Sequence, residues 1–301
     1  MTPLVVAAVL TAAVTHASWN ALAHHIRDQL LAFTLVGGGG TLCGLALACF
    51  APVPAAGAWP ALLVSAVLHT VYQLLLMRSF GLGDFGQMYP IARGTAPLVV
   101  TVLAAVFLHE WPGAWQLTGV AFASAGLLGV ALWGIRRKGG GAGRGGAGEA
   151  GIRAGRGGGS QRPALIAAVA TGLAIASYTV VDGVGVRAAG SPLGYLAWLM
   201  LLEGLAIPVY ALVTRRRALA AQLRPVAARG LLGGALSVAA YGLVLWAQTR
   251  APLAPVAALR ESSIIAGAAI GAVFFKERFG APRMAASVLM VGGIALMLHG
   301  S

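Results

Sequence analysis

Charged side chains, and acidic ones above all, are scarce in this chain. Only 10% of its 301 residues are charged, and Asp and Glu together number 8 against 21 Lys and Arg. A water-soluble protein of this length needs more polar surface than such a sequence can supply. Hydrophobic residues instead make up 58% of the chain. The composition therefore indicates an integral membrane protein.

Cysteine is nearly absent, and the two that occur are poorly placed for chemistry. Cys43 and Cys49 lie six residues apart in an apolar run, which suits neither a metal site nor a disulfide within one helix. We expect both to pack as small hydrophobic side chains. The sequence has no Cys/His ligand cluster, so we expect no metal site, and we interpret His16 as structural.

Catalytic and nucleotide-binding motifs are missing as well. The sequence contains no Walker A pattern, no HExxH and no nucleophile elbow. The segment RESS (260–263) has two serines but no assignable base, and Glu110 and Glu277 are interpreted as boundary and packing signals. We therefore expect neither an enzyme nor a resident cofactor, and no ATP hydrolysis within this chain.

Long apolar runs fill most of the sequence. Each is about 20 residues long, enough for a helix to cross a hydrocarbon core of about 30 Å. The runs lack strand-like alternation, and in lipid only helices and closed barrels satisfy their own backbone groups. The first run has no basic segment before it, so it is interpreted as a permanent span and not a signal peptide. We predict ten spans, at 4–23, 30–51, 59–77, 86–108, 114–135, 163–184, 193–213, 227–249, 254–275 and 281–299.

The second half of the chain repeats the first. With a shift of 167 residues, Arg93 falls on Arg260 and Glu110 falls on Glu277. An internal duplication in a very apolar chain is typical of transporters that hold the substrate between the two copies. The predicted units are a five-helix repeat over 1–135, a Gly/Arg-rich flexible linker over 136–162 and a second five-helix repeat over 163–301.

Basic residues are placed unevenly along the chain. The linker alone carries seven basic residues and one acid, Glu149, which suits a loop beside anionic lipid headgroups better than an RNA-binding tract. Most other Lys and Arg lie in loops after odd-numbered spans, so these loops and the linker are predicted to be cytoplasmic and both termini external. Because each copy has five spans, the two copies would insert in opposite orientations.

Several short motifs recur at matching places. An apolar helix ends in LHEWPG (108–113) or FKERFG (275–280), a later helix contains AGLLG (125–129) or VGGIAL (291–296), and HASWNAL (16–22) has the counterpart IASYTVV (175–181). Together with the repeat, these motifs resemble the EamA-type, ten-helix form of the drug/metabolite transporter superfamily. The resemblance implies an all-α membrane protein of two inverted five-helix repeats around a central cavity. It also implies transport of small metabolites, often amino acids or related compounds.

Charged residues within the spans are the strongest functional signals, because each costs at least about 2.5–3.5 kcal/mol to insert. We hypothesise that Arg93 and Arg260 reach a central cavity from opposite repeats, where a guanidinium suits a carboxylate or phosphate. Pairing with an internal acid is the favoured alternative, although Arg260 and Glu261, as adjacent helical residues, point about 100° apart and need not pair with each other. Asp182 and Glu203 are candidates for a coupling proton, although for Asp182 an interfacial place at a helix end is favoured.

Uncharged polar and aromatic residues form stripes on several spans. Tyr72 and Gln73 share a face with His69, and Tyr241 shares one with Ser237. Single residues in such stripes serve most often in interhelical hydrogen bonds, but the two stripes together favour a wet cavity. The candidates for lining it are Trp19, Asn20, Tyr72, Gln73, Tyr89, Arg93, Tyr178, Tyr241, Gln248, Arg260 and Glu261.

The favoured function is secondary transport of a small organic, amino acid-like metabolite across the cytoplasmic membrane by alternating access. Two alternatives are a flippase for a lipid-linked headgroup, with a cavity open sideways to lipid, and a non-transporting scaffold, with a dry interior. The expected partners are a small-molecule substrate and membrane lipid, with no nucleic acid. The sequence leaves a homodimer open, and it does not identify the substrate, the direction of transport or the coupling ion.

Overall fold

The computed structural model describes residues 1–24, 26, 28–82, 85–140, 162–267 and 281–299, and the regular structure within these ranges is entirely helical. Most of the linker and the second half of the predicted ninth span therefore lie outside the described residues. The α-helices are α1 (Pro3–His24), α2 (Gln29–Ala48), α3 (Trp59–Leu82), α4 (Phe85–Leu108), α5 (Ala114–Gly140), α7 (Arg162–Ala188), α8 (Pro192–Glu203), α9 (Ala206–Arg215), α10 (Ala218–Leu223), α11 (Ala227–Gln248), α12 (Leu253–Arg260) and α14 (Ala281–His299). Two short 3-10 helices, η1 (Ala56–Ala58) and η3 (Arg224–Val226), precede α3 and α11.

Seven helical stretches are long and apolar enough to cross a membrane. The all-helical membrane fold predicted from the sequence is confirmed at this level. The count of ten spans stays a prediction, because these seven stretches come from the described residues alone and parts of the predicted spans lie outside them. The stretches are Pro3–Ala23, Gln29–Ala48, Ala56–Ser79, Met88–Leu108, Arg162–Ala188, Pro192–Arg215 and Ala218–Gln248.

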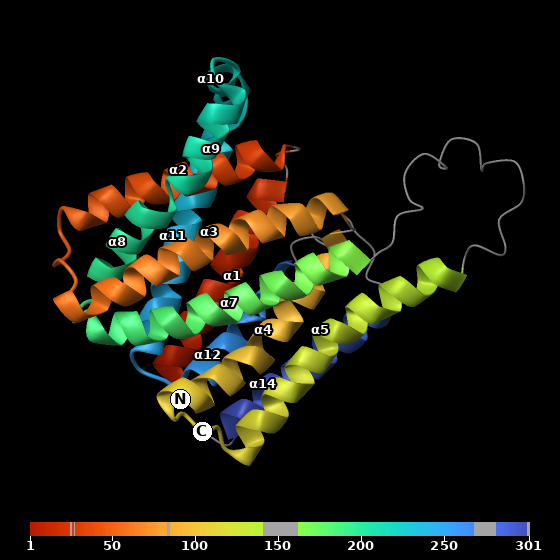
Figure 1. Ribbon diagram of the computed structural model, residues 1–301. Helices are drawn as coiled ribbons and strands as arrows, with labels where there is room; N and C mark the ends of the chain where they lie inside the picture. Colours follow the sequence, from red (N-terminus) through yellow and green to blue (C-terminus); the bar gives the residue numbers. More distant parts are fainter. Residues whose placement is uncertain (25, 27, 83–84, 141–161, 268–280, 300–301) are drawn as a thin grey trace, which may run out of the picture.

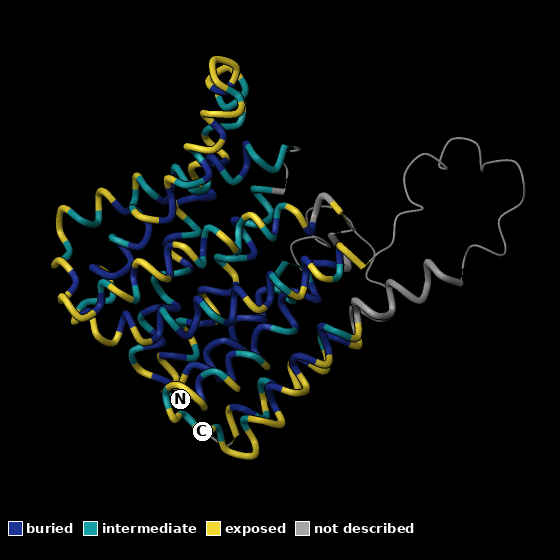
Figure 2. The backbone as a smooth tube through the Cα atoms, viewed as in Figure 1, coloured by how far each residue is buried: buried dark blue, intermediate teal, exposed yellow. Residues whose placement is uncertain are grey.

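Apolar side chains cover the outside of the bundle as well as its interior. Leu45 of α2, Val64 of α3 and Phe107 of α4 are all exposed, and Figure 2 shows exposed positions along the outer faces of the helices. In water such a surface would lead to aggregation. In a bilayer the same surface contacts acyl chains, so the burial pattern agrees with the composition.

The helices of the two halves interleave instead of forming two separate bundles. α1 packs on α11 and α3 packs on α7, while α4 packs on α7 and α1 on α12. When every helix is replaced by its counterpart in the other half, the contact of α1 with α11 becomes that of α7 with α3. In the same way, the contact of α4 with α7 becomes that of α12 with α1. Three further pairs join counterparts directly, namely α5 with α14, α2 with α8, and α4 with α12.

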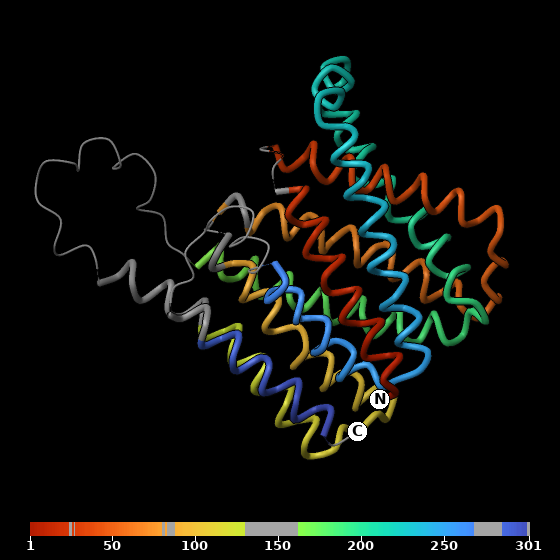
Figure 3. Tube along the Cα trace, turned by 180° about the vertical axis from the view of Figure 1, so that it is seen from behind, coloured from red at the N-terminus to blue at the C-terminus, as the bar shows by residue number. Residues whose placement is uncertain are grey.

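The two ends of the chain lie on the same side of the molecule. Figures 1 and 3, which view it from opposite directions, both place the start of α1 and the end of α14 there. α5 ends and α7 begins on the opposite side. The segment from α9 to α10 projects beyond the rest of the helices.

Two predicted spans are interrupted. The predicted span 193–213 consists of α8 and α9, which are separated at Gly204 and Leu205. Gly204 passes the backbone of Gly37 on α2 so closely that an added Cβ would lie 2.8 Å from the Gly37 carbonyl oxygen. α12 ends at Arg260, and the helix resumes at 263–267 after a turn at Glu261 and Ser262.

Proline has a different effect in the two halves. α4 stays continuous through Pro90 and Pro97. Pro252 instead lies at the N-cap of α12, just outside the helix, and Pro255 lies in its first turn, where its missing N–H removes no helical hydrogen bond.

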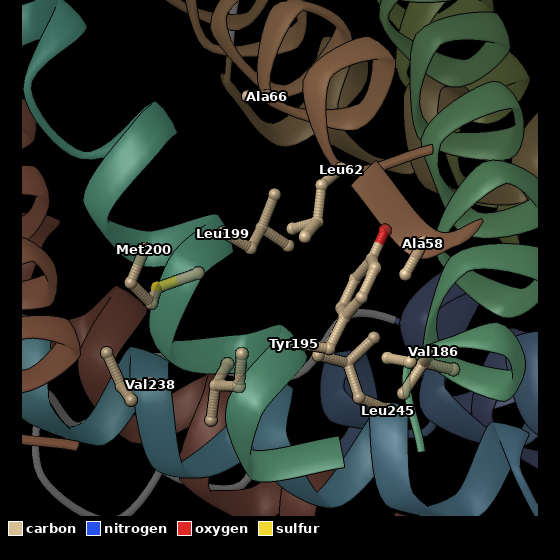
Figure 4. Packing of buried hydrophobic residues seen from close by; sticks show 11 residues of the cluster. Ala58, Leu62, Ala66, Val186, Tyr195, Leu199, Met200, Val238 and Leu245 are labelled. Carbon is tan, nitrogen blue, oxygen red and sulfur yellow. The ribbon is translucent and has the colours of Figure 1, made fainter. Parts of the chain in front are cut away.

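Small residues permit a very close contact between α5 and α14. Gly119 and Gly293 face each other there, and a Cβ added to either would collide with the carbonyl oxygen of the other. In lipid there is little hydrophobic drive between helices, so close backbone approach must supply van der Waals contact. Elsewhere larger side chains fill the interior, as around Tyr195, which packs with Leu62, Leu199 and Leu245 (Figure 4).

Candidate functional site

A cavity of about 100 Å³ lies among helices from both halves of the chain. This is room for several water molecules or a small solute. α1, α2 and α3 form one part of its wall, and α7, α8 and α11 form the other. The lining residues are His16, Trp19, Phe33, Val36, Gly37, Gly40, His69, Tyr72, Gln73, Tyr178, Met200, Glu203, Gly204, Gly234, Ser237, Val238 and Tyr241.

Aromatic rings form a continuous part of this wall. Tyr178 stacks on the ring of His69, with centroids 3.9 Å apart, and Tyr72 meets Tyr178 edge to face at 5.5 Å. Tyr241 contacts His69 edge to face at 5.4 Å. Such rings can hold the apolar body of a ligand while their polar tips orient it. They also suit an organic cation, through the negative face of the ring.

Acidic side chains meet a histidine beside the cavity. His69 approaches Glu203 to 3.4 Å through Nδ1 and Asp182 to 3.9 Å through Nε2. The same Nδ1 lies 3.0 Å from the carbonyl oxygen of Ser65, one turn earlier on α3. The three ionisable groups come from α3, α7 and α8, so only the packing of these helices brings them together.

Asp182, for which the sequence favoured an interfacial place at a helix end, is fully buried within the protein. α7 extends to Ala188, beyond the predicted end of this span at 184, so Asp182 lies further from the helix end than expected. Tyr195 donates a hydrogen bond of 2.8 Å to its Oδ1, and the hydroxyl of Tyr241 donates to Oδ2. These two hydroxyls satisfy a carboxylate that would otherwise be costly to bury.

The two intramembrane arginines share one acid. Arg93 of α4 approaches Glu261 to 2.8 Å and donates a 2.9 Å hydrogen bond to Ser263. Arg260 lies 3.9 Å from the same carboxylate. All three charged side chains are buried, and the guanidinium of Arg93 lies 5.7 Å from the centre of the Tyr89 ring. The group therefore holds two cations against one anion.

The structure separates the predicted cavity residues into two sets. Trp19, Tyr72, Gln73, Tyr178, Tyr241 and the coupling candidate Glu203 line the cavity. Asn20 instead donates to the carbonyl of His16 at 3.1 Å, and Gln248 is buried with no hydrogen bond to its side chain in the described part of the chain. Tyr89, Arg93, Arg260, Glu261 and Asp182 lie outside the lining, and all of them except Tyr89 are buried.

Sequence reasoning missed some members of the site. His69 appeared only as a neighbour on a polar stripe, yet it bridges both buried carboxylates. Phe33 and Met200 lie on apolar spans without a distinguishing pattern, so no signal would have selected them. Gly204 lines the cavity at the break between α8 and α9, which the sequence did not predict. His16, interpreted as structural, lines the cavity and accepts a hydrogen bond of 3.2 Å from Trp19.

A second polar cluster closes the bundle on the side where the chain ends lie. Arg187, near the end of α7, forms a 2.6 Å ion pair with Glu110, which follows α4. Arg187 also donates to the carbonyls of Gln248 and Ala251, at 2.8 and 3.1 Å. Glu110 accepts a 2.8 Å hydrogen bond from the backbone of Leu253, at the start of α12. The cluster thus ties the ends of four helices together.

Comparisons with known proteins agree with this architecture. The model of the EamA-like transporter family matches residues 3–132 and 162–299. A solved structure described as "Crystal structure of protein" has a TM-score of 0.69 and 17% sequence identity, over 100% of this chain and 98% of that chain. That similarity concerns the fold alone. No curated protein matches this chain.

Proposed function

Because this chain belongs to the EamA-like transporter family, we propose that it is a secondary transporter of a small organic metabolite, amino acid-like or related, in the cytoplasmic membrane. The observation that carries the proposal is the cavity, which residues of both family-matched segments enclose. A site between two repeats is where transporters of this construction bind their substrate.

The helix contacts support alternating access by two repeats. The contacts of α1 with α11 and of α3 with α7 exchange when the halves exchange, as a pseudo-twofold axis would require. Each five-helix repeat, inverted relative to the other, would rock about the shared cavity. On the side of the chain ends, the ion pair of Arg187 with Glu110 would have to open before the cavity could reach that face.

Arg260 is the cation that we propose for contact with a negatively charged substrate group. Arg93 lies 2.8 Å from Glu261 and donates to Ser263, whereas Arg260 lies 3.9 Å from the same carboxylate. Arg260 is therefore the less closely paired of the two buried cations. A buried charge without close compensation is costly, and a carboxylate on the substrate would compensate it.

The cavity bears on the two alternative functions. A non-transporting scaffold should have a dry, tightly packed interior, yet polar side chains from five helices line the cavity in this bundle. A flippase would need a sideways opening of this cavity to lipid.

The test combines ligand binding with transport. Purified protein is screened against a panel of amino acids and related metabolites for thermal stabilisation. A ligand at 100 times its Kd should stabilise the fold by about 2.7 kcal/mol. Compounds that stabilise the protein are then tested for uptake into proteoliposomes.

A matched pair of variants tests whether the substrate passes through the cavity. Ser237→Trp places a ring in the cavity, while Leu232→Trp places the same ring on the lipid-facing side of the same helix. We expect the first variant to abolish uptake and the second to preserve it. If no metabolite stabilises the protein, or if Ser237→Trp transports normally, the proposed function is wrong.

A further inference from the structure

Three ionisable side chains share one buried site beside the cavity. His69, Asp182 and Glu203 are 6%, 0% and 8% exposed, and the imidazole lies between the two carboxylates at 3.9 and 3.4 Å. Their helices α3, α7 and α8 pack on one another. Such a group needs a function, because intramembrane charges are rare where they have none.

His69 contacts its neighbours through both ring nitrogens. Nδ1 lies 3.0 Å from the carbonyl oxygen and 3.1 Å from the hydroxyl oxygen of Ser65, one turn earlier on α3. Nδ1 also lies 3.4 Å from Glu203, while Nε2 lies 3.9 Å from Asp182. Each ring nitrogen therefore faces one of the two carboxylates.

The two carboxylates have different surroundings. Asp182 accepts hydrogen bonds from Tyr195 and Tyr241, which stabilise its ionised form. Glu203 has a buried carboxylate oxygen, Oε2, without a hydrogen-bond partner in the described residues, and it lines the cavity. An ionised carboxylate in that condition is poorly solvated, whereas a proton would neutralise it. Glu203 is therefore the member of the group that is suited to exchange a proton with cavity water.

The charges around the group do not offset two anions. The titratable groups that face it are Tyr178 and Asp182 from α7, Tyr195 and Glu203 from α8, and Tyr241 from α11. Within the described ranges no Lys or Arg lies within 4 Å of either carboxylate, and no set of three or more ligands could hold a metal ion. With a neutral imidazole the group carries two negative charges in a low dielectric, and one proton removes half of that charge.

We propose that His69, Asp182 and Glu203 form a proton-binding site that couples proton movement to the state of the cavity. The site takes up one proton from water in the cavity on Glu203, which becomes a neutral carboxylic acid. Release returns the proton to water, so the exchange needs no other reactant. The inference deepens the proposed transport function and rests on it.

The location of the site explains how a proton can affect the cavity. Glu203 is the last residue of α8, immediately before the break at Gly204, which also lines the cavity. Tyr178 and Tyr241 each contact this site and also line the cavity. Protonation of the site would therefore change the affinity for a substrate bound against these rings, and substrate binding would change the proton affinity of the site.

The test needs no identified substrate. Full-length protein in lipid nanodiscs is titrated with acid and base while infrared difference spectra record the carbonyl stretch of protonated carboxyl groups. We expect a band from a poorly hydrogen-bonded acid that appears and disappears reversibly with pH. Glu203→Gln should remove this band or reduce it by at least half. Gln keeps the shape of the side chain and removes only the buried charge, which the fold should tolerate.

Two further variants and a control complete the experiment. Asp182→Asn and His69→Gln should each shift the pH midpoint of the band, because both groups interact with the acid. Asp28→Asn, which changes a half-exposed carboxylate paired with Arg215, should leave the band unchanged. Gel filtration confirms that each variant is folded. A band that is unchanged in Glu203→Gln, Asp182→Asn and His69→Gln would overturn the proposal, as would its loss in Asp28→Asn alone.

The two proposals fail in different ways. If the band behaves as expected but no metabolite enters proteoliposomes, the proton site stands and the transport function is wrong. If a metabolite is transported with the same pH dependence in Glu203→Gln and Asp182→Asn as in the unaltered protein, the transport function stands. In that case the coupling role of this site is wrong.

Discussion

At the scale of single residues, the interior depends on a few acids placed among many apolar side chains. Glu261 is the clearest example, because its one carboxylate lies beside the two buried guanidinium groups of Arg93 and Arg260. Removing one partner from a buried ion pair leaves the other charge without compensation. The duplicated sequence predicted that the two arginines hold equivalent places. It did not identify Glu261 as the partner of Arg93, because that contact joins residues from opposite halves.

Glu261→Gln should therefore destabilise the protein strongly. Loss of a partner in a buried pair costs about 3–5 kcal/mol, and here two cations lose their only acidic neighbour among the described residues. Thermal unfolding of the purified full chain, followed by tryptophan fluorescence, measures the change.

Asp28→Asn is the matched control for this measurement. Asp28 and Arg215 form a 2.7 Å pair at the surface, with each side chain 34% exposed, so its loss should cost about 0–1 kcal/mol. Asn also preserves the N-cap that Asp28 provides to α2. Equal destabilisation by the two substitutions would show that Glu261 does not compensate the buried arginines.

At the scale of helices, small residues decide which pairs can approach most closely. α5 and α14 meet at Gly119 and Gly293, where backbone faces backbone. The spacing of glycines along one helix does not indicate which other helix packs against it. The sequence likewise predicted one continuous span at 193–213, because hydropathy does not register the break at Gly204 that separates α8 from α9.

Gly119→Ala should weaken the contact between α5 and α14. The added methyl group would collide with the carbonyl oxygen of Gly293, and backbone atoms cannot move aside as a flexible side chain can. We expect a loss of about 1–3 kcal/mol, the usual cost of overpacking, measured as lower thermal stability in detergent.

The same helix supplies the control for that substitution. Gly129 also lies on α5, and nothing lies within 4 Å of a Cβ added to it. Gly129→Ala should therefore leave the stability unchanged or raise it slightly, because alanine has the higher helix propensity. If both substitutions have the same effect, helix propensity and not the contact with α14 determines the result.

At the scale of the whole molecule, the arrangement of the chain ends bears on its orientation in the membrane. The start of α1 and the end of α14 lie on one side, opposite the end of α5 and the start of α7 (Figures 1 and 3). The distribution of Lys and Arg predicts that the linker side is cytoplasmic. Both termini should then be external.

Cysteine labelling in intact cells tests this orientation. In a background with Cys43→Ala and Cys49→Ala, a membrane-impermeant maleimide should label Thr2→Cys directly. Ala147→Cys, in the linker, should react only after the membrane is permeabilised. Labelling of Ala147→Cys in intact cells, with Thr2→Cys protected, would mean that the orientation is reversed.

The sequence by itself determined that this protein lies in lipid and is built from helices in two duplicated halves. Apolar runs long enough to cross a bilayer dictate helices, because lipid offers no other partner for the backbone, and the duplication placed Arg93 and Arg260 in equivalent positions. Only the tertiary structure decided which polar groups meet. His69, Asp182 and Glu203 are spread over more than a hundred positions of the chain, and Arg93 lies still further from Glu261 in sequence. Helical periodicity reports which face of one helix a residue occupies, but not which other helix packs against that face.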